Sequence, residues 1–175
     1  RAVRRNPRAL VVVTGCYAEM EADVCAAIPG VDLVVRNEGK SSIADRVRQY
    51  QNGPGAVLLQ NRPEQLTGIA DELLSGYDDR TRAFVQVQQG CDQSCTFCII
   101  HQARGPSRSF SLKRVERQIE LLIERDYREI VICGVDLGSW GRDFEIQSSC
   151  RQQDMVTLLQ RASKFPGDYR IRLSS

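Results

Sequence analysis

The segment AFVQVQQGCDQSCTFC, residues 83–98, joins a strand-like run to three closely spaced cysteines. Apolar and polar side chains alternate over residues 83–88, which predicts a β-strand. Gly90 then permits a sharp change of direction, and the thiols follow at the spacing CxxxCxxC: Cys91, Cys95 and Cys98. Thiols packed this closely are typical of metal ligation, so the segment predicts a metal-binding loop at the carboxyl end of a strand.

Two kinds of metal site fit three thiols. A cubane iron–sulfur cluster normally takes four thiolates, so three leave one iron open to bind the amino and carboxylate groups of S-adenosylmethionine. The alternative is a structural zinc module of the Cys3His type, in which His101 supplies the fourth ligand of a tetrahedral site. The spacing by itself favours the cluster and leaves the zinc module open.

The composition is that of a globular protein, because 42% of the 175 residues are hydrophobic, which is enough to bury a core. A charged fraction of 26% and a net charge of +2 neither indicate nor exclude a nucleic-acid partner. Seven cysteines, three of them in one loop, favour metal ligation in a reducing compartment, so we expect a cytoplasmic protein. No apolar run approaches the roughly 18 residues of a membrane span, and the basic residues 1–8 lack the apolar core of a signal peptide. We expect no membrane contact.

The residues before the cysteine loop predict a first α/β unit over residues 1–65. The apolar, β-branched run ALVVV at residues 9–13 is typical of a strand buried on both faces. The elements expected after it are a helix at 19–27, a strand at 31–35 and a helix at 41–50. Cys16 directly follows the first strand, where ligands of open α/β sheets gather; an inert buried cysteine is the alternative.

A polar linker at residues 66–81 separates this unit from a second one over residues 82–175. Ser111 can cap a helix whose apolar residues keep helical spacing. The further expected elements are a strand at 129–133, a loop at 134–141, a helix at 154–164 and a strand at 169–173. Strand and helix alternate, which is the order of a (β/α) barrel with its active site at the carboxyl ends of the strands.

Four motifs together resemble one family. They are TGCYA at 14–18, VDLVVRNEGK at 31–40, GCDQSCTFCII at 90–100 and ARGPSRS at 103–109. In content and order they are similar to those of the radical S-adenosylmethionine (SAM) methylthiotransferases. The resemblance implies an α/β fold: part of the amino-terminal methylthiotransferase domain, followed by the first half of a radical SAM (β/α) TIM-like barrel.

The resemblance also implies two 4Fe-4S clusters. One would lie on Cys91, Cys95 and Cys98 and, with an electron donor, cleave SAM to a 5'-deoxyadenosyl radical. The other would lie on Cys16 and two further cysteines, and would carry the sulfur that is methylated and inserted. Cys25 occupies neither position, so we expect the missing pair to precede Arg1 and the sequence to be an inactive piece of a longer enzyme.

The substrate implied by the resemblance is tRNA. GVDLGSWG at 134–141 and IRLSS at 171–175 look most like the branch that methylthiolates threonylcarbamoyladenosine next to the anticodon. The alternatives are isopentenyladenosine in tRNA and an aspartate of a ribosomal protein. His101 and Gln102 depart from the family, whose members usually carry proline and tyrosine after CII.

Four further residues are candidates for binding. Phe97 is expected beside the adenine of SAM, although a core aromatic would look the same in sequence. Gly134, which opens the loop after the second strand of the second unit, is expected at the cofactor. Arg104 and Arg108 follow the cysteine loop and are expected to meet tRNA phosphates, with a solvated surface as the alternative.

Overall fold

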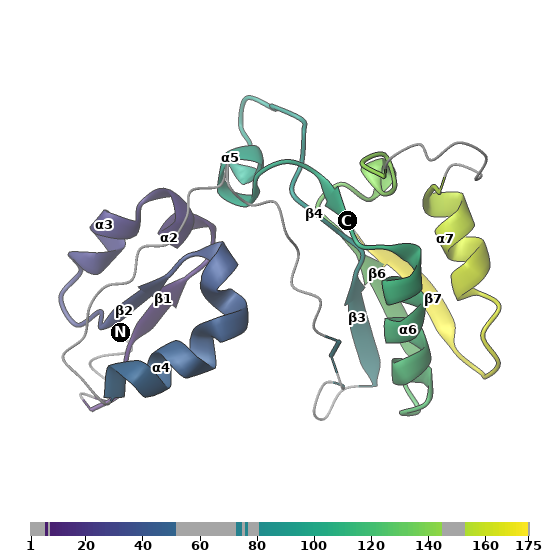
Figure 1. Ribbon diagram of the computed structural model, residues 1–175, viewed down its shortest axis with the longest axis horizontal. Coiled ribbons are helices and arrows are strands. Elements are labelled where there is room, and N and C mark those ends of the chain that lie inside the picture. The colour runs from purple at the N-terminus through teal and green to yellow at the C-terminus, as the bar shows by residue number, and fades with distance from the viewer. Residues whose placement is uncertain are drawn as a thin grey trace. The chain divides into compact units, whose positions relative to one another are not determined.

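The computed structural model of the chain (Figure 1) describes residues 6, 8–51, 73–74, 76, 81–144 and 153–174. The chain divides into two compact units, one formed by Arg1–Gly68 with Gln93–Gly105 and the other by Ile69–Asp92 with Pro106–Ser175. Most of the linker expected at residues 66–81 lies outside the described residues. The segment that carries Cys95 and Cys98 therefore packs with the first unit rather than with the strand that precedes it.

The first unit contains a parallel pair of strands. β1 (Val12–Thr14) pairs with β2 (Leu33–Val35), with Val13 opposite Val34. The helical elements are α2 (Cys16–Met20), α3 (Ala22–Ala26), the 3₁₀ helix η1 (Asn37–Ser42), α4 (Ile43–Gln51) and α5 (Ile100–Arg104). The buried core side chains are Ala18, Ala22, Cys25 and Val34. The burial of Cys25 agrees with its interpretation as a small apolar filler.

The prediction of a single helix at 19–27 is wrong, because the helical segment begins earlier and is divided into two helices. Helix α2 already begins at Cys16, directly after Gly15, and Glu21 separates it from α3. The backbone angles of Glu21, φ −127° and ψ 51°, lie outside the helical region, which is why the helix breaks there. As a result, Cys16 lies in the first turn of a short helix rather than in a loop.

The second unit is built on a parallel three-stranded sheet. β3 (Arg82–Gln86), β6 (Glu129–Cys133) and β7 (Arg170–Ser174) adjoin one another in sequence order. A separate antiparallel pair joins β4 (Gln88–Gln89) to β5 (Arg108–Ser109). The helices are α6 (Leu112–Ile123), the 3₁₀ helix η3 (Leu137–Ser139) and α7 (Met155–Ala162). Parallel strands joined through helices confirm the α/β class.

The strand expected at residues 83–88 ends earlier than its alternating pattern predicts. β3 stops at Gln86, and Gln88 and Gln89 leave the sheet to pair with β5. The reason is a long-range partner, because β5 belongs to the ARGPSRS segment and offers backbone groups that the sequence pattern of the strand does not reveal.

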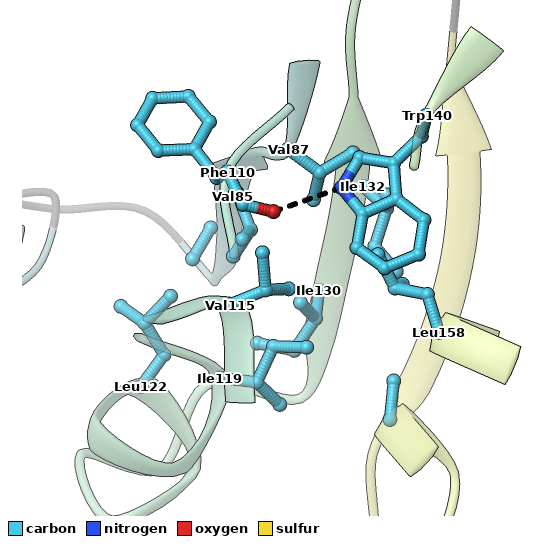
Figure 2. Close-up of a cluster of buried hydrophobic side chains, with 12 residues drawn as sticks. Val85, Val87, Phe110, Val115, Ile119, Leu122, Ile130, Ile132, Trp140 and Leu158 are labelled. Carbon is cyan, nitrogen blue, oxygen red and sulfur yellow. Dashed lines mark hydrogen bonds between the residues drawn. The ribbon is translucent and has the colours of Figure 1, made fainter. Parts of the chain in front are cut away.

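The core of the second unit lies between the sheet and its helices (Figure 2). The apolar face of α6 contributes Val115, Ile119 and Leu122, all fully buried, as their helical spacing predicts. Each such side chain contributes about 1.5–3 kcal/mol by burial. The indole Nε1 of Trp140 donates to the Phe110 carbonyl at 3.1 Å, so this large side chain is buried with its polar atom satisfied.

Candidate functional site

The cysteine loop begins at Gly90, a buried residue with φ 76°. That conformation suits glycine because a side chain would be strained there. The amide of Cys98 donates to the Cys95 carbonyl at 3.0 Å, which closes a tight turn before α5. Cys95 is exposed, Cys91 and Cys98 are half-buried, and all three are free thiols. Because all three thiols are free and at least partly exposed, they are suited to metal ligation.

The fit of this loop to a metal rests on its donors. Among the described residues, no three His, Cys, Asp or Glu side chains are already gathered as a metal site. The boundary between the two units falls between Asp92 and Gln93, so Cys91 belongs to one unit and the other two thiols to the other. Three free thiols on one short loop can supply soft sulfur ligands that suit an iron–sulfur cluster and also zinc.

Gln88 supports the start of this loop. Its side chain is fully buried, and its Nε2 donates to the Gly90 carbonyl at 2.7 Å and to Ser107 Oγ at 2.9 Å. Its Oε1 accepts a hydrogen bond from the Asp136 amide at 2.8 Å. One amide therefore ties the residue before Cys91 to two other loops of the same unit. The sequence did not single out Gln88, since an alternating strand pattern does not show where a strand ends.

Gly134 has a packing role in this arrangement. A Cβ at this position would lie 2.8 Å from Leu137 Cδ2 and 3.1 Å from Gln88 Cβ. Both distances are shorter than ordinary carbon–carbon contacts, so the absence of a side chain lets Gln88 approach the loop at 134–141. The expected contact of Gly134 with the cofactor stays a prediction.

Cys16 meets a cation from a distant part of the chain. The Nε of Arg104 donates to Cys16 Sγ at 3.3 Å, and both residues belong to the first unit. Lys40 is a second nearby cation: burial and then the charge of Arg104 lower the pKa of its ammonium, while Cys16 and Glu19 act in the opposite direction. This thiol is half-buried rather than fully buried and accepts a hydrogen bond from Arg104, and its role as a cluster ligand or as an inert cysteine stays a prediction.

Two partly buried hydrogen bonds through Asn37 link α5 to α2. The side-chain Nδ2 of Asn37 donates to the Ala103 carbonyl at 2.7 Å, and the Asn37 amide donates to Glu19 Oε2 at 2.7 Å. Glu19 is almost completely buried, with Arg36 Nη1 3.8 Å from its Oε1. The NEGK motif marked Asn37 in the sequence, but its role depends on a partner far along the chain.

The remaining binding candidates differ in exposure. Phe97 is 92% exposed, which excludes the core interpretation, and its contact with adenine stays a prediction. Arg108 is only 9% exposed, so the alternative of a solvated surface is wrong for this residue. Its pairing in β5 explains the difference, because the strand turns this side chain inward. Contact of Arg104 or Arg108 with RNA stays a prediction.

Within the described part of the chain, no helix is both long and apolar enough to span a membrane.

Comparison with known proteins places residues 85–175 in the radical SAM superfamily. The chain is 35% identical to "Threonylcarbamoyladenosine tRNA methylthiotransferase MtaB" of Thermotoga maritima, over 98% of this chain and 37% of that protein. It is 34% identical to the Bacillus subtilis protein of the same name, over 100% of this chain and 38% of that protein.

A relative with another name is less similar. The "tRNA-2-methylthio-N(6)-dimethylallyladenosine synthase" of Aquifex aeolicus is 28% identical over 98% of this chain and 38% of that protein. The chain thus spans less than half the length of the curated relatives it matches. Because the family model matches more than half of the chain, the chain belongs to the radical SAM superfamily.

Proposed function

We propose that the chain is part of a tRNA methylthiotransferase that adds a methylthio group to threonylcarbamoyladenosine next to the anticodon. The observation that carries this proposal is the presence of two separate thiol sites, the loop of Cys91, Cys95 and Cys98 and the cation-flanked Cys16. The cysteine loop suits the cleavage of SAM, and the site at Cys16 suits sulfur insertion. A structural zinc module would not need a thiol site at Cys16.

The cysteine loop is the proposed site of the first 4Fe-4S cluster and of SAM. When bound, this cluster supplies the electron that cleaves SAM, and an external electron donor must replace that electron. Gln88 holds the start of the loop through Gly90 and also holds the Asp136 amide. Because β3 and β6 are parallel neighbours, the loops after them leave the same edge of the sheet. Gly134 and the exposed Phe97 are the proposed contacts of SAM.

Cys16 is the proposed ligand of a second 4Fe-4S cluster, together with two cysteines outside this sequence. Cys16 is a free, half-buried thiol whose Sγ accepts a hydrogen bond from Arg104. None of the described cysteines forms a disulfide, which supports the proposed action in a reducing compartment such as the cytoplasm. The proposed division of labour is cofactor cleavage at one cluster and sulfur transfer at the other.

The choice of nucleoside is supported by the order of identity. Four relatives named for threonylcarbamoyladenosine are 34–36% identical to the chain, whereas a fifth of that name and three named for dimethylallyladenosine are 28% identical. Isopentenyladenosine in tRNA and an aspartate of a ribosomal protein are the alternative substrates. Contact of the buried Arg108 with tRNA phosphates remains part of the proposal. For Arg104, which already donates to Cys16, a phosphate contact and a role at Cys16 are the two alternatives.

The deciding experiment is mass spectrometry of tRNA nucleosides from cells that lack the full-length gene. We expect 2-methylthio-threonylcarbamoyladenosine to disappear, and to return with the wild-type gene but not with a Cys95→Ser gene. Loss of only the isopentenyladenosine derivative, or of a ribosomal-protein modification, would overturn the substrate assignment. A colourless protein with one bound zinc after anaerobic reconstitution with iron and sulfide would overturn the enzyme assignment.

A further inference from the structure

The contact between Arg104 and Cys16 is the feature that leads beyond this proposed function. Arg104 ends α5, on the same segment as Cys95 and Cys98, while Cys16 begins α2. The Nε of Arg104 donates to Cys16 Sγ at 3.3 Å, which is within hydrogen-bonding range for sulfur. The segment of one proposed cluster site therefore supplies a donor to the ligand of the other.

The backbone that carries Arg104 is held in place. The neighbouring Ala103 is fully buried, and its carbonyl accepts a hydrogen bond from Asn37 Nδ2 at 2.7 Å. Asn37 is in turn anchored through its amide to the buried Glu19, which lies on α2 as Cys16 does. The backbone beside Arg104 and the helix that carries Cys16 are thus linked by the same two partly buried hydrogen bonds. A contact built in this way is pre-organised rather than a chance position of a long surface side chain.

We propose that Arg104 is a positioning residue for the second cluster, which donates a hydrogen bond to the Cys16 sulfur and thereby raises the reduction potential of that cluster. This inference rests on the proposed function, since it takes Cys16 as a cluster ligand. A hydrogen bond to a ligating sulfur stabilises the more negative, reduced state, which is how outer residues tune iron–sulfur potentials. It assigns Arg104 a role in the cluster site in place of the RNA contact expected from sequence.

The test uses the full-length protein with Cys91, Cys95 and Cys98 replaced by alanine, so that only the second cluster loads. Arg104→Met removes the donor at similar length, Arg104→Lys returns a donor, and Arg125→Met is a control at an exposed arginine of the other unit. The potential is measured by redox titration followed by electron paramagnetic resonance. We expect a lower potential in Arg104→Met, a partial return in Arg104→Lys and no shift in the control. In the otherwise wild-type protein, we expect tRNA binding by Arg104→Met to remain unchanged.

The outcomes separate this inference from the proposed function. If Cys16→Ala loses one cluster but the reduction potential of the second cluster is unchanged in Arg104→Met, the inference is overturned and the proposed function stands. A Cys16→Ala protein that keeps the iron of two clusters overturns the second cluster site, and the inference with it. If Arg104→Met fails to load the second cluster, loading restored by Arg104→Lys supports the inference, and equal loss in both variants overturns it. Weaker tRNA binding in Arg104→Met would favour the phosphate contact instead.

Discussion

The two thiol sites of this chain are supported in different ways. The three thiols of the cysteine loop lie close in sequence, are open to solvent to different degrees, and have Gln88 as their nearest buried support through Gly90. Cys16 is a single thiol whose surroundings are assembled from distant residues, with Arg104 as hydrogen-bond donor and Lys40 as a further cation. The first arrangement leaves Cys95 exposed to solvent, whereas the second places a guanidinium against the Cys16 sulfur. This difference suits the proposed roles of the two sites, cofactor cleavage and sulfur transfer.

The largest expected effect is at the cysteine loop. In the full-length enzyme, alanine at Cys91, Cys95 or Cys98 should abolish the formation of 5'-deoxyadenosine, because two remaining thiolates are too few to hold the cluster. Chromatographic measurement of 5'-deoxyadenosine checks this. Cys16→Ala is the matched comparison: it should keep uncoupled cleavage, lose about half of the bound iron and make no methylthiolated nucleoside. Wild-type cleavage in any loop variant would remove the distinction between the two sites.

The next effect concerns the support of the loop. Gln88→Ala should lower the free energy of unfolding by about 2 kcal/mol, because the buried Gly90 carbonyl and the partly buried Asp136 amide both lose this partner. Urea unfolding of the apoprotein measures the change, and Gln102→Ala, on the exposed side of α5, is the control with little effect. The variant should also retain less iron at the loop than at Cys16. Equal retention at both sites would show that Gln88 does not support the loop specifically.

A smaller effect is expected at the neighbouring loop. Gly134→Ala should cost about 1 kcal/mol by overpacking, since the new methyl group would press on Leu137 and Gln88. Gly138→Ala is a sharp control in the same loop, because its Cβ would lie 3.6 Å from Asp136 Oδ1, an ordinary contact. Thermal unfolding of both variants compares them. A Gly138→Ala protein less stable than the Gly134→Ala protein would contradict the packing role.

The smallest effect is expected at Cys133, a thiol that belongs to neither proposed cluster site. Burial raises the pKa of the Cys133 thiol above its ordinary value of 9.0. A raised native pKa contributes stability that is fully present below pH 9.0 and is lost as the pH rises through the native value. The free energy of unfolding should therefore fall above pH 9.0, and Cys133→Ala should show a shallower decline over the same range. Equal slopes in the two proteins would show that Cys133 is already accessible in the native state.

Much of the fold could be predicted from local patterns. The helical spacing of Val115, Ile119 and Leu122 predicted the buried face of α6, and the apolar runs predicted parallel strands with helices between them. The predictions failed where a partner far along the chain decides the geometry. β3 ends at Gln86 because β5 pairs with the residues after it, and Arg108 is turned inward by the same pairing. Periodicity describes a residue's neighbours along the chain and is silent about such partners.

The sequence by itself determined the thiol spacing of the cysteine loop, the α/β order and the family, because each of these is written in nearby residues or in motifs kept in order. Only the tertiary structure decided what surrounds Cys16. The bond from Arg104 joins residues 88 positions apart, and the bond that anchors Ala103 to Asn37 joins residues 66 positions apart. Hydrogen bonds and charges act over a few ångströms in space, so folding must bring such residues together before their chemistry can be recognised.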